Sequence, residues 1–170
     1  VIFDLTVAIE IGLVIACVLF MKRVMETTEI SVIKDEIDPN KESDLEVHEE
    51  RLTIPKGVEV YEINGPYFFG IATKFEETMA QLGDRPKIRI IRMRKVPFID
   101  STGIHNLTNL CQMSQKENIH IILSGVNEKV HNVLEKSGFY ELLGKENICS
   151  NINEALAVAD KEIKELTRDE

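Results

Sequence analysis

The chain opens with an almost uninterrupted apolar run, from Val1 to Met21, which few structures can accommodate. Its length approaches the roughly 20 residues that an α-helix needs to cross a bilayer. Three polar side chains interrupt it: Asp4, Thr6 and Glu10. Lys22 and Arg23 follow at once, and positive charge is typical of the cytoplasmic end of a spanning helix. We therefore expect residues 1–26 to form the end of a transmembrane helix.

Two other interpretations of this run stay open. A secretory signal carries basic residues before its apolar stretch and small residues after it, which is the reverse of the order found here. A buried helix of a soluble protein is the second, because Asp4 and Glu10 shorten the uninterrupted apolar stretch. In a spanning helix such ionisable residues generally face other helices of a bundle. The preferred interpretation therefore predicts contacts with further membrane segments.

An acidic segment follows the apolar run and separates it from the rest of the chain. Residues 27–50 are dense in acids and contain a turn signal, Asp38-Pro39-Asn40, a composition typical of a solvated linker. We expect a cytosolic domain to occupy residues 51–170. The formal net charge of -9 makes nucleic acid a poor partner, because the chain would repel its phosphates.

From Arg51 onward the pattern alternates between strands and helices. Residues 57–70 predict a short hairpin that turns at Asn64-Gly65, and residues 71–83 predict an amphipathic helix. A strand over 86–96, a helix opening at Asp100, a strand over 119–126 and two more helices follow. Such alternation indicates the α/β class with a largely parallel sheet. The residues expected in the core are Phe75, Ile88, Ile90, Leu107, Leu110, Ile121, Ile122, Leu123, Val133 and Leu134.

A small polar cluster, Asp100-Ser101-Thr102-Gly103, stands where the strand over 86–96 gives way to a helix. Asp100 and Ser101 are good helix caps, because their oxygens accept from the N–H groups that a helix start leaves unpaired. Strand-to-helix junctions also lie at the carboxyl ends of strands, where α/β folds commonly hold functional groups. The residues alone leave capping and a chemical role both open.

No pattern in the chain points to a metal, a cofactor or catalysis. The cysteines, at positions 17, 111 and 149, form no CxxC pair and fit a reduced compartment. The four histidines show no metal spacing, and neither a phosphate-binding loop nor a dinucleotide-binding glycine pattern is present. We expect no enzymatic activity, no cofactor and no metal site.

Three runs together resemble the C-terminal end of SulP-type anion transporters: "DLTVAIEIG" from residue 4, "RMRKVPFIDSTGIHNL" from residue 92 and "SGVNEKVHNVLEKSGF" from residue 124. The resemblance covers nearly the whole chain. It implies that residues 51–170 form a STAS domain, with a mixed, mostly parallel sheet of four to five strands flanked by helices. A transporter of this kind exchanges or symports anions such as sulfate or bicarbonate.

The same resemblance implies a setting and partners. The chain would belong to the inner or plasma membrane, with the STAS domain in the cytoplasm as a regulatory and protein-interaction domain. Its partners would be the membrane domain of the transporter, a second copy in a homodimer formed through the transporter, and an unidentified cytosolic protein. A soluble phospho-switch of the anti-sigma-factor-antagonist type is the alternative.

The resemblance also assigns roles to individual residues. In the antagonists a kinase phosphorylates the second hydroxyl residue of the cluster, which is Thr102 here, and Ser101 is the neighbouring candidate. A threonine stands where those switches carry serine. Nucleotide binding is a further idea for STAS domains, and Arg92, Arg94 and Lys95 would supply the positive charge. These three side chains could equally form a solvated strand face or pair with acids.

Overall fold

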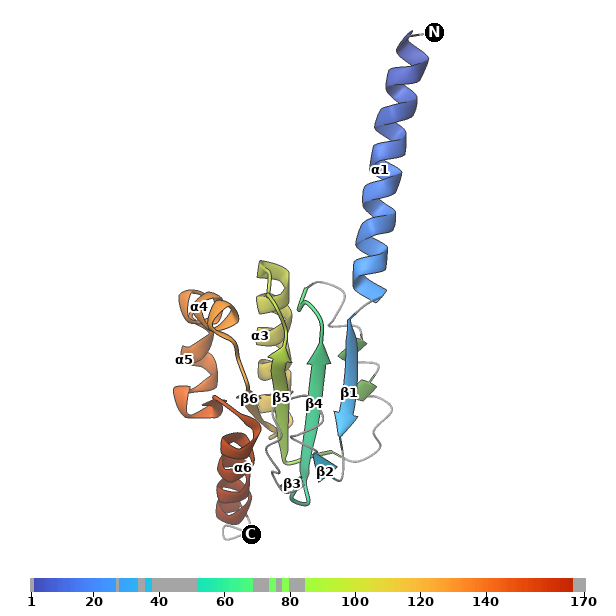
Figure 1. The fold of residues 1–170 in the computed structure, drawn as a ribbon. Helices are drawn as coiled ribbons and strands as arrows, with labels where there is room; N and C mark the ends of the chain where they lie inside the picture. The colour runs from blue at the N-terminus through green and yellow to red at the C-terminus, as the bar shows by residue number, and fades with distance from the viewer. Residues whose placement is uncertain are drawn as a thin grey trace.

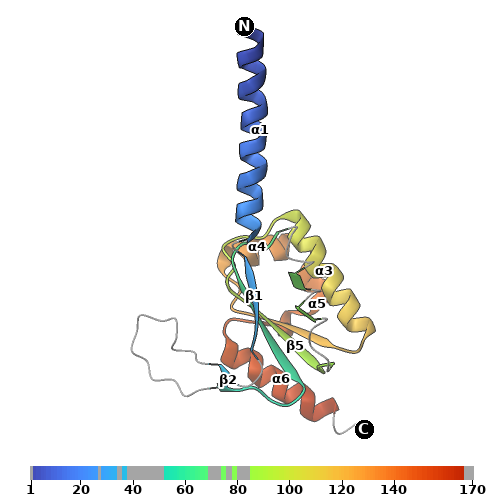
Figure 2. The ribbon, with the colours of Figure 1, turned by 90° about the vertical axis from the view of Figure 1, so that its right-hand side faces the viewer.

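The computed structural model describes residues 2–26, 28–33, 36–37, 52–68, 74–75, 78–79 and 85–166. Helix α1, Ile2–Glu26, extends as a single rod away from the remainder of the chain (Figures 1 and 2). Its stretch Asp4–Arg23 has a mean hydropathy of 2.2 and is not buried by any other part of the structure. By length and composition it is the one described helix that could cross a membrane.

A five-stranded sheet forms the centre of the domain, in the order β1-β4-β5-β6-β7. Strand β1 is antiparallel to β4, whereas the pairs β4–β5, β5–β6 and β6–β7 are parallel. The strands are β1 Glu29–Ile33, β4 Val58–Asn64, β5 Ile88–Lys95, β6 His120–Ser124 and β7 Ile148–Cys149. Two short strands, β2 Glu36–Ile37 and β3 Leu52–Thr53, pair separately. The predicted mixed, mostly parallel α/β sheet is confirmed.

The antiparallel pairing differs from the prediction. The hairpin expected at Asn64-Gly65 is wrong, because β4 pairs with β1, which comes from the acidic segment assigned to a linker. The stretch after Gly65 instead continues beside the segment that follows β5, and Tyr67 forms a parallel bridge with Ile99. Period-two alternation identifies a strand and its faces, but it leaves the choice of partner to tertiary packing.

Helices cover both faces of the sheet (Figure 1). Alternate strand residues point to opposite faces, so each strand contributes to two apolar layers. Tyr61, Ile91 and Leu123 pack on the side of α3, α4 and α5. Val60, Ile90 and Ile122 pack on the side of α6. The helices are α3 Ser101–Lys116, α4 Glu128–Lys136, α5 Phe139–Leu143 and α6 Ile152–Leu166, with a 3-10 turn, η1 Lys145–Asn147, before β7.

Nine of the ten expected core residues are buried. Val133 is the exception, with an exposed fraction of 36%, because α4 turns Val130 and Leu134 inward and Val133 lies on its outer side. Of the helix predicted over 71–83, residues 74–75 and 78–79 are described and are helical. The other positions of that prediction lie outside the described residues.

Candidate functional site

The polar cluster begins helix α3, and Asp100 is its N-cap. Asp100 has an extended backbone, with φ -98° and ψ 177°, and its Oδ1 accepts a hydrogen bond of 2.6 Å from the backbone N–H of Gly103. Its backbone oxygen accepts another of 2.9 Å from the N–H of Ile104. This is the geometry of a carboxylate cap, which satisfies one of the free donors of the first turn. The capping role of Asp100 follows directly from these two bonds.

Gly103 is required by a close backbone contact. A Cβ atom at this position would lie 2.3 Å from the backbone oxygen of Tyr67 and 2.9 Å from Cγ1 of Ile99. Tyr67 is in turn held by backbone hydrogen bonds on both sides of Ile99: its N–H donates to Phe98 at 3.0 Å, and its oxygen accepts from Asp100 at 3.4 Å. The first turn of α3 therefore rests on the backbone of Tyr67 without room for a methyl group.

The two hydroxyl residues of the cluster face solvent. Ser101 and Thr102 are exposed, and the nearby side chain of Phe98 is 51% exposed. The first turn of this 16-residue helix contains no acidic residue after the cap. The positive end of the helix dipole therefore favours added negative charge at these positions. Chemically, the arrangement offers hydroxyls that a partner can reach on a firmly packed helix start.

Two of the three basic residues, Arg92 and Lys95, pair with an acid on the neighbouring strand. Arg92 is buried, and its Nη1 lies 3.1 Å from Oε1 of Glu62 on the neighbouring strand. The ammonium of Lys95 lies 3.9 Å from Oε2 of the same Glu62. Arg94 is exposed, and its Cβ borders the turn at Gly125. Of the two interpretations left open above, pairing with an acid describes Arg92 and Lys95.

Sequence reasoning missed two residues that organise this region. Glu62 lies at a buried position of β4. An acid at a position where the strand pattern expects an apolar residue indicates a buried cationic partner, so the sequence could have predicted this pair. Tyr67 follows Pro66, and no periodicity or motif in the sequence marks it as a contact of the cluster. Asn127 is the N-cap of α4, since its Oδ1 accepts from the N–H of Val130 at 3.0 Å. Its Nδ2 also donates to the oxygen of Val96, which fixes the loop before the cluster.

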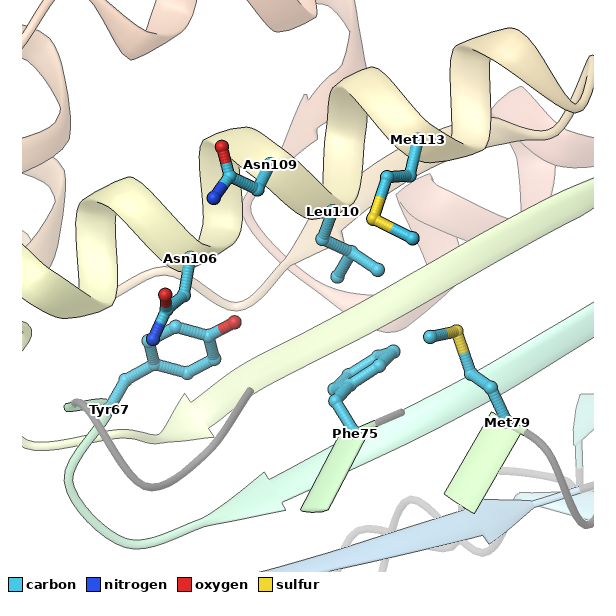
Figure 3. Close-up of a pocket in the computed structure, with 7 residues that line it drawn as sticks. All are labelled: Tyr67, Phe75, Met79, Asn106, Asn109, Leu110 and Met113. Carbon is cyan, nitrogen blue, oxygen red and sulfur yellow. The ribbon is translucent and has the colours of Figure 1, made fainter. Parts of the chain in front are cut away.

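A pocket of about 120 Å³ lies beside the cluster, between α3 and the helical residues 74–75 and 78–79 (Figure 3). Its lining is mainly apolar, and the Tyr67 hydroxyl lies among the side chains that form it. Burial raises the pKa of the Tyr67 hydroxyl, so this group stays neutral at physiological pH. The lining residues are Tyr67, Phe75, Met79, Asn106, Asn109, Leu110 and Met113.

Neither the pocket nor the cluster has the composition of a metal centre. Within the described part of the chain, no group of three or more His, Cys, Asp or Glu side chains could hold a metal ion. The thiol of Cys111 is buried, and burial raises its pKa to about 12. A thiol that stays protonated is a poor nucleophile, so Cys111 acts as a packing residue.

The comparisons with known proteins agree on one family. The STAS domain family matches residues 51–155. Sulfate transporter 1.1 of Arabidopsis thaliana is 28% identical over 174 residues, covering 94% of this chain and 27% of the transporter. A sulfate transporter family protein of Wolinella succinogenes is 40% identical with a TM-score of 0.63, covering 66% of this chain and 93% of that one. A Vibrio cholerae SulP transporter STAS domain is 38% identical with a TM-score of 0.59, covering 66% and 88%.

Other solved structures share the fold at lower identity. The murine anion transporter Slc26a9 aligns with 91% of this chain and 25% of its own at 21% identity and a TM-score of 0.63. An anti-sigma factor antagonist from Mycobacterium paratuberculosis aligns with 76% of this chain and 93% of its own at 15% identity and a TM-score of 0.51. At such identities the likeness concerns the fold alone.

The relatives also bear on the size of the protein and its class. The chain spans about a quarter of the length of the sulfate transporters that it matches along most of its own sequence. The relatives are transporters and STAS domains rather than enzymes. The match over residues 51–155 and the 40% identity to the Wolinella succinogenes protein show that this chain belongs to the STAS domain family, among the STAS domains of SulP-type sulfate transporters.

Proposed function

We propose that residues 51–170 act as the cytosolic regulatory and protein-interaction domain of a secondary-active SulP-family anion transporter of the sulfate or bicarbonate class. Helix α1 would be the last spanning helix of the transporter, and the segment after it joins the sheet of the domain through β1. Its stretch Asp4–Arg23 is apolar and fully exposed, which suits a lipid or helix-bundle environment. Lys22 and Arg23 at its end favour a cytoplasmic position for the domain.

One observation carries the regulatory part of this proposal. Ser101 and Thr102 are exposed at the first turn of α3, while Asp100 and Gly103 on either side are tied into the fold. A phosphate on Thr102 would add about -1.5 to -2 charges at a place where the helix dipole favours them. The phosphate would therefore change the charge of the surface that a partner protein contacts, without lowering the stability of the fold. A cytosolic partner and a homodimer through the transporter belong to the same proposal.

Sulfate uptake by the complete protein in cells or proteoliposomes tests the proposal. We expect Thr102→Glu to change the uptake rate and Thr102→Ala to prevent any regulation that depends on phosphate. Thr53→Glu is the matched control, because it places the same acid at an exposed threonine on β3, away from the cluster. Wild-type uptake in both Thr102 variants, with the domain folded, would refute the regulatory role of the cluster.

A soluble phospho-switch is the second candidate, because an anti-sigma factor antagonist shares the fold. In that case α1 would pack against protein in aqueous buffer. Expression of the chain with and without residues 1–26 separates the two functions. We expect the longer form to require detergent or lipid, because its apolar side chains are exposed along α1. A monodisperse longer form in buffer alone would favour the soluble switch.

Nucleotide binding has less support in the geometry. It would draw on Arg92, Arg94 and Lys95, but the guanidinium of Arg92 is buried in its ion pair with Glu62. A bound phosphate would have to compete with that carboxylate for the same charge. Equilibrium binding of a nucleotide to wild type and to Arg94→Ala would test the idea, and equal affinities would exclude Arg94 as a contact.

A further inference from the structure

The residue that leads from α1 into the sheet is held in the core of the STAS domain. Thr28 lies two positions after the end of α1 at Glu26 and is only 3% exposed. Its Oγ1 donates a hydrogen bond of 3.3 Å to the backbone oxygen of Pro66. The ammonium of Lys74 donates to the backbone oxygen of Thr28. The end of α1 is therefore attached to the turn that follows β4.

The attachment includes a close contact between Thr28 and Gly65. A Cβ atom on Gly65 would lie 2.8 Å from Oγ1 and 3.1 Å from Cα of Thr28, and the residue has a φ of 119°. An L side chain rarely adopts this backbone conformation, and here it would also collide with Thr28. The N–H of Gly65 donates to the oxygen of Lys95 at 3.3 Å. Thr28 thus cannot move toward the turn without displacing it.

The same turn supports the polar cluster on its other side. Tyr67 accepts a hydrogen bond from Asp100, and its backbone oxygen touches Gly103. Among the described residues, the turn at 65–67 thus contacts Thr28 on one side and the first turn of α3 on the other. In Figure 1 this turn lies at the upper end of β4, between the lower end of α1 and the start of α3. A methyl group is obstructed at Gly103 by the backbone oxygen of Tyr67, and at Gly65 by Oγ1 and Cα of Thr28.

We propose that Thr28, Gly65 and Tyr67 are positioning residues that transmit a change at the Asp100–Gly103 cluster to helix α1. The inference rests on the proposed function, because it supplies the route by which that cluster would influence a transporter. An acid or phosphate at Thr102 adds charge and volume to the first turn of α3. Gly103 in that turn packs on Tyr67 without room for a methyl group, so any shift of the turn is passed to residues 65–67, and Gly65 contacts Thr28. A solvated linker at this place would absorb the same displacement.

Amide hydrogen exchange of the protein in phospholipid nanodiscs tests the route. We expect Thr102→Glu to change the exchange rates of Thr28–Ile33 by about 2- to 30-fold, the range of coupling carried through contiguous contacts. The change should disappear when Gly65→Ala is added. Gly57→Ala is the matched control, because Gly57 has a φ of 85° but a Cβ there would meet only the side chain of Lys87, at 3.8 Å. The effect of Thr102→Glu should persist in Gly57→Ala.

The outcomes separate this inference from the proposed function. Unchanged exchange at Thr28–Ile33, together with altered sulfate uptake in Thr102→Glu, would overturn the route and leave the regulatory function in place. Loss of the effect in both glycine variants would also overturn it, because general loosening would then be the cause. If Gly65→Ala does not fold, Thr28→Val decides: it removes the hydroxyl bond to Pro66 and should shrink the effect, whereas Thr53→Val should leave it unchanged.

Discussion

At the scale of single residues, both the site and the fold depend on the lack of a Cβ atom at Gly103. Replacing glycine by alanine inside a helix ordinarily stabilises it by about 1 kcal/mol. At Gly103 the added methyl would meet the backbone oxygen of Tyr67 at 2.3 Å, and a backbone atom cannot turn aside as a side chain can. The contact therefore reverses the sign that helix propensity alone would give.

We accordingly expect Gly103→Ala to lower the free energy of unfolding by roughly 1–3 kcal/mol, the usual cost of overpacking. Urea denaturation of the wild type and the variant measures it. Ser101→Ala is the control, since this exposed position on the same turn should change stability by less than about 0.5 kcal/mol. A Gly103→Ala variant as stable as the wild type would show that the contact with Tyr67 is looser than described.

The pair formed by Glu62 and Arg92 is the second residue-scale feature. Both side chains are largely buried, with exposed fractions of 11% and 8%, so neither charge is well solvated alone. Removal of one partner leaves the other buried without compensation, which typically costs about 3–5 kcal/mol. Lys95, at 3.9 Å from Glu62, lessens the cost when Arg92 is removed.

A double-mutant cycle measures this interaction. We expect Arg92→Met to destabilise the domain strongly, and Glu62→Leu with Arg92→Met to recover much of that loss, because an apolar pair of similar volume requires no charge compensation. Chemical denaturation of the two single variants and the double variant gives the coupling free energy. Strictly additive losses would mean that the two side chains do not interact as the structure shows.

At the scale of elements, the start of α3 is capped by Asp100 and exposes the hydroxyls of Ser101 and Thr102 to solvent. The carboxylate of Asp100 holds the N–H of Gly103, and loss of such a cap typically costs about 0.5–2 kcal/mol. We expect Asp100→Ala to lower the free energy of unfolding by this amount, as measured by thermal denaturation. Asp100→Asn should keep most of the wild-type stability, because asparagine also caps helices. If Asp100 is only a cap, binding of partners by the folded fraction of Asp100→Ala remains unchanged. A fully stable Asp100→Ala variant would contradict the capping role.

Sequence patterns predicted some elements well and others poorly, for identifiable reasons. Strands β5 and β6 were predictable from their apolar runs, and helices α3 and α4 were predictable because a capping residue marks the start of each one. Strand β1 was not, since its five residues lie in a segment dominated by acids. Helix α5 has only five residues after Gly138, too few to show a period. The contact between Tyr67 and Gly103 depends on tertiary pairing of residue 67 with residues 98–100, which no local pattern encodes.

At the scale of the whole molecule, folding keeps several weak acids protonated. Burial raises the pKa of the thiol of Cys111 from 9.0 to about 12. Burial, with the nearby carboxylates of Glu154 and Glu162, raises that of Cys149 to about 11. Burial also raises the pKa of the hydroxyls of Tyr61 and Tyr67 above its ordinary value of 10.0. Between the unfolded and folded pKa values the folded chain binds more protons than the unfolded chain.

Stability must therefore fall as the pH rises through this alkaline window, because the unfolded chain releases protons that the folded chain retains. The contribution of these groups is fully present below pH 9, where thiols of the unfolded chain are still protonated, and is lost toward pH 11–12. We expect the melting temperature of wild type to decline from about pH 8 to about pH 10.5. In the double variant Cys111→Ala/Cys149→Ala, the melting temperature should decline less steeply with pH than in wild type. In Cys17→Ala, which alters an exposed cysteine on α1, it should decline as in wild type. Equal slopes in all three proteins would show that the buried thiols do not set the alkaline limit of the fold.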